Sequence, residues 1–172
     1  RLRSRGLGDV YKRQKQYITN TFESALAEAA FMTGLERNAD VVVMSCYAPL
    51  FSMVEGEQWR HNLIWFNPSS VLKTANFYVQ KMFSTTVGKR ILKIDRALPR
   101  GVFASATLSE DGVCLKIVNT TKNRQDFHLS LIGFDPDTIK SIILHSDNMN
   151  EKNTLAFEGF PVENVVPSTA EE

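Results

Sequence analysis

The chain has 172 residues, of which 43% are hydrophobic and 23% charged, a composition typical of a folded globular protein rather than a disordered one. Its formal charge is +1, but five of its 20 Lys and Arg residues lie before position 15, and the remainder is slightly acidic. This argues against nucleic acid as a partner, because phosphate binding needs clustered basic residues, and no apolar run reaches the roughly 20 residues that span a bilayer, so we expect no membrane partner.

The first 14 residues, RLRSRGLGDVYKRQ, show neither the periodicity of an amphipathic helix nor the apolar stretch of a secretory signal. The run VYKRQ within them resembles translated adapter sequence at the ends of metagenomic reading frames. We therefore interpret residues 1–16 as an artefactual or disordered head and expect the natural protein to begin further upstream. A polyanion-binding tail is the less favoured alternative, since the basic run is brief and holds one aromatic residue, Tyr11.

A helix is predicted over residues 22–37, FESALAEAAFMTGLER, which are rich in Ala, Leu, Glu and Met. Asn20, with Glu23 three residues later, predicts the N-cap. An apolar stripe at helical spacing predicts packing against a broad surface such as a sheet. The stripe comprises Phe22, Leu26, Ala29, Ala30 and Thr33, widened by Ala25, Phe31, Met32 and Leu35.

The next segments predict an α/β unit. The run VVVM at 41–44 is mostly β-branched and does not alternate, which indicates a strand buried on both faces, as in a parallel sheet. A polar loop is predicted over 51–61, a second buried strand over 63–66 and a helix over 71–84. Helix, strand, long loop, strand and helix in this order favour parallel strands.

From about residue 90 the pattern changes to short apolar or alternating runs separated by turn residues, which predicts an antiparallel sandwich. The boundary between the two halves is expected within 86–98. The segment SEDG at 109–112 predicts a hairpin turn. The predicted strands are 102–108, 113–118, 127–132, 141–145 and 155–157.

The few cysteines and histidines predict neither a disulfide framework nor a metal site. Cys46 and Cys114 belong to different halves, and we expect both to be small buried hydrophobic residues. The three histidines, His61, His128 and His145, have no metal-ligand spacing among themselves or with the cysteines. We expect no cofactor.

Several phrases together resemble the α-L-arabinofuranosidases of glycoside hydrolase family 51. LAEAAFMTGLERNADVVVMSCYAPLF, QWRHNLIWFN and ANFYVQKMFSTTVG are similar to the last strands and helices of that family's (β/α)8 barrel, and NTLAFEGFPVENVVP to its final sandwich segment. The resemblance implies that residues 17–89 are the C-terminal portion of the barrel and residues 90–172 a jelly-roll-like C-terminal β-sandwich, so the fold class is α/β plus all-β. It also implies a retaining exo-glycosidase that releases terminal α-L-arabinofuranosyl groups from arabinan or arabinoxylan.

The chain lacks the catalytic pair that this activity needs. Retaining glycosidases use two carboxyl groups roughly 5 to 5.5 Å apart, and in the resembled family both are glutamates that precede the helix predicted here at 22–37. None of the glutamates present matches a family catalytic motif, and we expect them to be solvated charges: Glu23, Glu28, Glu36, Glu55 and Glu57. We therefore predict no catalytic residue in this chain and no activity of the chain alone.

Four residues are candidates for contact with sugar. Trp59 lies in a polar loop, where its indole could stack on a pentose ring or fill the barrel rim, and both alternatives stay open. The resemblance places Asn62 where the family has a polar side chain that reaches the arabinose pocket. His61 could donate a hydrogen bond to a hydroxyl, although a lone loop histidine is more often surface. Tyr47 follows the strand predicted at 41–44, together with Ser45 and Cys46, at the end where barrel sites form, although packing is the favoured role for it.

A carbohydrate-binding or structural β-sandwich module is the alternative function. It is less favoured because all Tyr and Trp residues lie before position 80, and the Phe residues after it are expected to be core: Phe103, Phe127, Phe134, Phe157 and Phe160. A barrel remnant would leave unpaired edges and apolar surface, so we predict aggregation or molten behaviour. For a polysaccharide-degrading parent the secreted or periplasmic location is favoured over the cytoplasm, and whether that parent is a homo-oligomer stays open.

Overall fold

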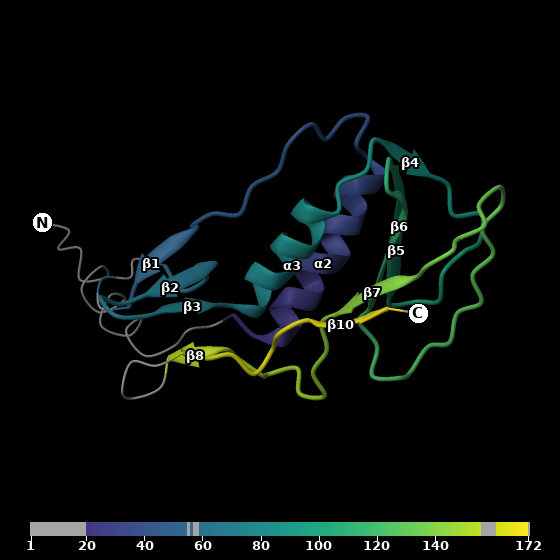
Figure 1. The fold of residues 1–172 in the computed structure, drawn as a ribbon. Helices are drawn as coiled ribbons and strands as arrows, with labels where there is room; N and C mark the ends of the chain where they lie inside the picture. The colour runs from purple at the N-terminus through teal and green to yellow at the C-terminus, as the bar shows by residue number, and fades with distance from the viewer. Residues whose placement is uncertain (1–19, 55, 57–58, 156–160, 172) are drawn as a thin grey trace, which may run out of the picture.

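The computed structural model describes residues 20–54, 56, 59–155 and 161–171, and over these the chain is a small mixed α/β domain with two helices and several small sheets. The head expected at 1–16 lies outside this part, as do Glu55, Glu57, Phe157 and Phe160. The helices α2 (Phe22–Arg37) and α3 (Ala75–Thr85) lie side by side, with the sheet of β1, β2 and β3 at one end of the pair and the hairpin of β5 and β6 along the other (Figure 1).

The helix predicted over 22–37 is confirmed, but its cap and its stripe differ from the prediction. Thr21 is the N-cap, because its side chain accepts a hydrogen bond from the backbone N–H of Ser24, and Asn20 is instead buried. Phe31 is exposed, so the stripe is narrower than predicted. The core that the two helices build with later segments consists of Phe22, Ala25, Ala29, Ala75, Val79, Phe83, Val118 and Val165.

Three short strands form the sheet before α3. They are β1 (Phe51–Met53), β2 (Ile64–Phe66) and β3 (Val71–Lys73). β1 and β2 are parallel, with Ser52 opposite Trp65, and β2 and β3 are antiparallel, with Trp65 opposite Leu72. The prediction of a strand near 63–66 is therefore confirmed. The loop predicted over 51–61 is wrong at its start, and the helix predicted over 71–84 begins later, because Thr74 caps α3 after β3 has ended.

The strand predicted at 41–44 is wrong. These residues belong to no described strand: the N–H groups of Val41 and Val42 donate to the carbonyl of Asn38 in the turn that ends α2. Val41, Val43 and Met44 are 72%, 94% and 85% exposed. Within the part of the chain that the structure describes, no strand lies beside them to pair with their backbone. A β-branched run favours extended backbone, but it does not supply the partner that makes a strand. Cys46, which follows this segment and was expected to be buried, is also exposed.

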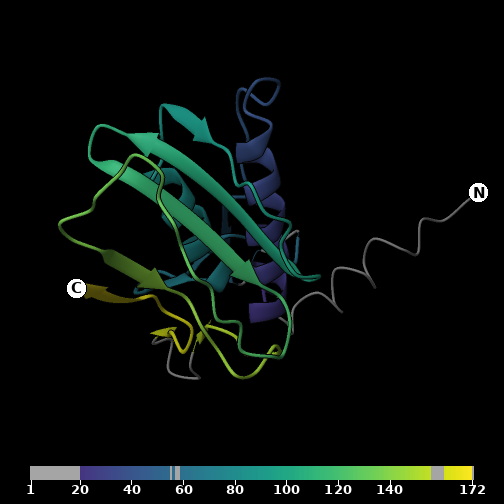
Figure 2. The ribbon, with the colours of Figure 1, turned by 90° about the vertical axis from the view of Figure 1, so that its right-hand side faces the viewer.

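The hairpin predicted at 109–112 is confirmed. β5 (Val102–Ser109) and β6 (Gly112–Asn119) pair antiparallel from Val102 opposite Asn119 to Ser109 opposite Gly112. Gly112 has a φ of +129°, which side-chain-bearing residues rarely adopt and glycine adopts freely. β4 (Arg90–Leu92) adds the third strand. The hairpin lies across the two helices (Figure 2).

The remaining strands are short and antiparallel, as predicted for this half. β7 (Lys140–Ile143) pairs with β10 (Ser168–Glu171), and β8 (Thr154–Leu155) pairs with β9 (Pro161–Val162). The strand predicted at 141–145 is confirmed in part by β7, and of the strand predicted at 155–157 only Leu155 is described, where it belongs to β8. The strand predicted at 127–132 is wrong: its residues alternate in polarity, but no described strand pairs with them and their side chains are exposed. Phe103, Phe127 and Phe134, expected to be core, are likewise exposed.

The C-terminal segment returns to the first helix. The N–H of Phe22 donates to the carbonyl of Glu151 at 2.9 Å, and the buried Asn153 donates to the carbonyls of Lys73 and Val165. Asn153 also accepts from the N–H of Val165 at 2.8 Å. One buried amide thus joins β3 to two parts of the C-terminal segment, which fixes both halves of the chain relative to each other.

Candidate functional site

The turn before β2 carries three of the four residues predicted to contact sugar. Asn62 is 2% exposed, and its Nδ2 donates to the backbone carbonyl of Trp59 at 2.6 Å. This bond closes the turn and holds Trp59, whose side chain is 64% exposed, at the surface. His61, between them, is also exposed. Trp59 is therefore exposed at the surface, whereas the side chain of Asn62 is buried and bonded to the backbone of the turn.

Tyr47 joins this turn to the segment before β1. Its hydroxyl donates to the backbone carbonyl of His61 at 3.2 Å and accepts from Nδ2 of Asn20 at 3.1 Å. The four predicted residues thus form one connected group, which we call the Trp59 turn: Tyr47, Trp59, His61 and Asn62. The group lies at the amino ends of β1 and β2, because both segments precede their strands. The expectation that Tyr47 follows a strand is therefore wrong, since 41–44 forms none.

A buried polar network lies behind the Trp59 turn, between α2 and α3. Asn20 donates to Oδ1 of Asn76 at 3.1 Å, and the hydroxyl of Ser24 donates to the same oxygen at 3.0 Å. Nδ2 of Asn76 and Nε2 of Gln80 both donate to the carboxylate of Glu28. Sequence reasoning missed this network. Its signal is the pair of polar residues four apart on each helix, which places both pairs on facing surfaces.

Burial of this network changes the pKa values of two of the groups at it, Glu28 and Tyr47. Burial raises the pKa of Glu28, and the hydrogen bonds from Asn76 and Gln80 oppose that rise. Burial also raises the pKa of Tyr47, the bond from Asn20 opposes it, and the negative charge of Glu28 adds to it. The Tyr47 hydroxyl is therefore protonated at neutral pH and can donate a hydrogen bond to the His61 carbonyl.

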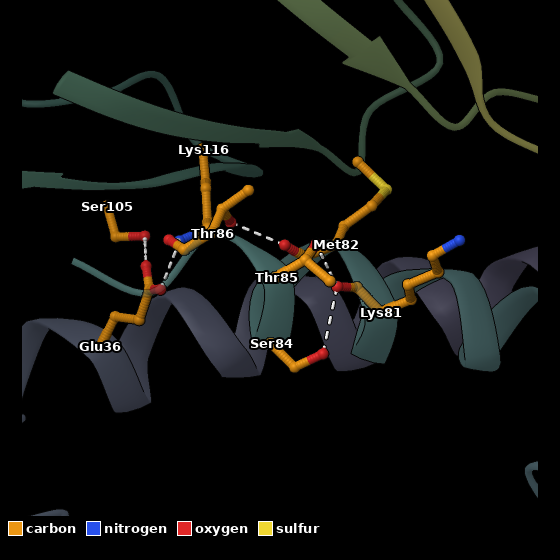
Figure 3. Close-up of polar contacts among 8 residues, drawn as sticks. All are labelled: Glu36, Lys81, Met82, Ser84, Thr85, Thr86, Ser105 and Lys116. Carbon is orange, nitrogen blue, oxygen red and sulfur yellow. Dashed lines mark hydrogen bonds and ion pairs between the residues drawn. The ribbon is translucent and has the colours of Figure 1, made fainter. Parts of the chain in front are cut away.

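A second polar cluster joins the end of α2 to the hairpin (Figure 3). The hydroxyl of Ser105 donates to Glu36 at 2.5 Å, and Lys116 forms an ion pair with the same carboxylate. Lys116 also donates to the backbone carbonyl of Thr86 at 3.0 Å, and its ammonium lies 5.2 Å from the centre of the Phe83 ring. Ser105 is 1% exposed and its partners are mostly buried, so this cluster holds the helices on the sheet and is closed to substrate.

The same view shows how α3 ends. The hydroxyls of Ser84 and Thr85 donate to the carbonyl of Lys81, and the hydroxyl of Thr86 donates to the carbonyl of Met82 at 2.6 Å (Figure 3). Ser and Thr side chains near a helix end often bond to carbonyls three or four residues earlier, and these three hydroxyls do so in the last turn of α3. Thr86, the C-cap of α3, accepts the hydrogen bond from Lys116 with its own carbonyl.

The two partly buried glutamates of α2, Glu28 and Glu36, are too far apart to form the pair of a retaining glycosidase. Glu28 and Glu36 lie eight residues apart on one helix, which separates them by about 12 Å along its axis, whereas such pairs are roughly 5 to 5.5 Å apart. Each is also engaged by its own partners. Glu163 accepts from the Tyr78 hydroxyl and from the N–H of Lys73. Among the described residues, no three His, Cys, Asp or Glu side chains gather to hold a metal ion, and no helix is long and apolar enough to cross a membrane.

Comparison with known proteins agrees with the resemblance. The model of the family described as "Alpha-L-arabinofuranosidase C-terminal domain" matches residues 8–171. The chain is 30% identical over 148 residues to alpha-L-arabinofuranosidase 1 of Arabidopsis thaliana, covering 80% of this chain and 22% of that protein. It is 34% identical over 114 residues to alpha-L-arabinofuranosidase A of Aspergillus niger, covering 64% of this chain and 18% of that protein.

A solved structure gives the same result for the fold. The arabinose-bound MgGH51 α-L-arabinofuranosidase matches with a TM-score of 0.78 and 32% sequence identity, covering 88% of this chain and 24% of that one. The present chain therefore spans about a fifth to a quarter of the length of these relatives.

Proposed function

Because the chain belongs to the α-L-arabinofuranosidase C-terminal domain family, we propose that it is the C-terminal part of a retaining exo-glycosidase. The substrate of the whole enzyme would be terminal, non-reducing α-L-arabinofuranosyl groups of arabinan or arabinoxylan. The observation that carries the proposal is the family match over residues 8–171, to which the fold likeness at 32% identity adds independent support.

We divide the chain into two structural parts on the basis of its strand pairing. Residues 17–89 would be the end of a (β/α)8 barrel and residues 90–172 a β-sandwich. The parallel pairing of β1 with β2 supports this division, because every described strand pair after residue 90 is antiparallel. β3, which pairs antiparallel with β2, does not distinguish the two parts. The exposed apolar residues at 41–44 support it as well, since upstream barrel strands would cover them.

The Trp59 turn would supply one wall of the arabinose pocket. The exposed indole of Trp59 offers an apolar face on which a pentose ring can stack. His61 would offer a polar contact beside it. Asn62 and Tyr47, whose polar atoms already bind the turn, would act as positioning residues that hold Trp59 in place.

Catalysis would need carboxylates from upstream of this chain. Glu28 and Glu36 on α2 are about 12 Å apart along the helix axis, too far for a retaining pair, and each is bonded to other side chains, so the chain alone should be inert. The test is incubation of the purified 172-residue chain with an aryl α-L-arabinofuranoside. We expect no release of the aryl alcohol above background, and detectable turnover that follows the chain through purification would overturn the proposal.

A further inference from the structure

A cavity of about 230 Å³ opens at the far end of α2 from the Trp59 turn. It lies between the last turn of the helix, the segment 94–98 and the start of β5. Since α2 has 16 residues and spans about 24 Å, the cavity is remote from the site proposed for arabinose. It is lined by Arg37, Ile94, Arg96, Leu98, Val102, Phe103 and Ala104.

Two guanidinium groups give this cavity a positive charge. Arg37 is fixed in place, because its Nη1 donates to the carbonyl of Ala104 at 2.6 Å and to the hydroxyl of Thr33 at 3.2 Å. Both bonds use one nitrogen, so its Nε and Nη2 groups have no partner in the described part of the chain. Arg96 forms no hydrogen bond or ion pair with another described residue.

Among the described residues, no carboxylate neutralises these two charges. None of the lining residues is acidic. The two acids that are next to them in sequence are already paired: Asp95 with Lys93 at 2.8 Å and Glu36 with Lys116. Two cations that share a cavity repel each other and favour an anion between them. A guanidinium presents parallel N–H groups that match a carboxylate in two-point contact.

The rest of the lining is apolar. Ile94, Leu98 and Phe103 line it, and Phe103 is 37% exposed although it lies on a strand of the central hairpin sheet. An aromatic face beside a charged group suits a ligand that combines an anion with a ring. The volume is below the roughly 300 to 1,000 Å³ of sites for drug-sized ligands, so it offers room for a single ring.

We propose that this cavity binds a sugar carboxylate, that is, one uronic acid residue with its carboxylate between Arg37 and Arg96 and its ring against Phe103. The ligand can be a free uronic acid or a uronic acid side group on a polysaccharide. The second source rests on the proposed function, whereas the first does not.

The test is a calorimetric titration of the 172-residue chain with D-glucuronate, with D-glucose, acetate and inorganic phosphate as matched probes. We expect saturable binding of glucuronate that weakens as salt is added, and no saturation with glucose or acetate. Arg96→Gln should weaken glucuronate binding at least tenfold, and Phe103→Leu should weaken it less. Arg90→Gln removes the same charge from an exposed position outside the cavity and should leave binding unchanged. Far-ultraviolet circular dichroism identical to wild type establishes that each variant is folded.

Equal binding of phosphate and glucuronate would overturn the proposal, as would equal weakening by Arg96→Gln and Arg90→Gln. A xylo-oligosaccharide that carries one glucuronic acid distinguishes the two sources. Tighter binding than free glucuronate supports the polysaccharide side group, and equal binding supports the free sugar acid. Neither result depends on arabinoside hydrolysis, so this proposal and the proposed function fail independently.

Discussion

The hydroxyl of Tyr47 donates a hydrogen bond to the backbone carbonyl of His61, 3.2 Å away, and accepts one from the side chain of Asn20. Three segments that are far apart in the sequence therefore meet at one oxygen atom. These two hydrogen bonds hold together the segments that lead into the parallel strands β1 and β2, since Tyr47 precedes β1 and His61 precedes β2.

The first prediction concerns Tyr47→Phe, which removes this oxygen and keeps the ring. We expect a loss of about 1 kcal/mol in the free energy of unfolding, the usual worth of a partly buried hydrogen bond. The backbone N–H groups of Leu63 and Ile64 donate to the carbonyls of the segment before β1, so their hydrogen exchange should become faster. Tyr78→Phe is the matched control, because its hydroxyl bonds to Glu163 instead. Faster exchange at Leu63 and Ile64 in both variants, or in neither, would contradict the role assigned to Tyr47.

The second prediction concerns the pH dependence of stability. Burial raises the pKa of Glu28 above its ordinary value of 4.5, so the folded chain takes up this proton more readily than the unfolded chain. The associated stability is fully present below the ordinary value and is lost as the pH rises through the folded-state pKa. In urea unfolding experiments from about pH 4 to about pH 7, the free energy of unfolding should therefore decrease less with rising pH in Glu28→Gln than in the wild type.

Glu23→Gln provides the control for this pH series. Glu23 lies in the first turn of the same helix and is exposed. We expect its variant to keep the pH dependence of the wild type. If Glu28→Gln and the wild type changed in parallel across the series, the partly dry environment assigned to Glu28 would be wrong.

The third prediction concerns the ion pair of Lys116 with Glu36. The side chains are 10% and 18% exposed, so Lys116→Met leaves a desolvated carboxylate with only Ser105 as donor. We expect a loss of about 3 kcal/mol in the free energy of unfolding, as for other buried pairs that lose one partner. The double variant with Glu36→Leu should recover part of that loss. Lys89→Met breaks a pair whose side chains are 70% and 81% exposed, and it should cost less than about 1 kcal/mol. Equal losses for the two single variants would refute the structural role of the cluster.

The fourth prediction concerns the apolar residues at 41–44. Val43 is 94% exposed and belongs to no strand, so we expect the chain alone to self-associate through this segment. Val43→Lys should lower light scattering at a given chain concentration, whereas Ala39→Lys adds the same charge at an exposed neighbouring position and should have little effect. Light scattering by the wild-type chain that does not rise with chain concentration would contradict this expectation.

The sequence predicted what depends on local pattern. The residues of α2 follow from apolar spacing along one helix, and the hairpin of β5 and β6 follows from a turn signal between two apolar runs. Trp59, His61 and Asn62 were found as candidates because they are close in the sequence. That Tyr47 bonds to this turn could not be read from spacing, since the bond spans 14 positions.

The failures concern features that depend on distant partners. The β-branched run at 41–44 and the alternating run at 127–132 have the composition of strands, but strand formation needs a second strand, which no local pattern supplies. Asn20 was predicted to cap the helix because of its residue type. It is drawn instead into the buried network with Asn76, which lies 56 positions away, and Thr21 takes the cap.

The most direct test of the central claim is a graft. Residues 17–172 would replace the matching C-terminal region of the Aspergillus niger relative, and the chimera and the isolated chain would be assayed side by side on an aryl α-L-arabinofuranoside. We predict turnover by the chimera, its reduction by Trp59→Ala in the graft, and none by the isolated chain. Turnover by the isolated chain, or a folded chimera with no activity, would contradict the account.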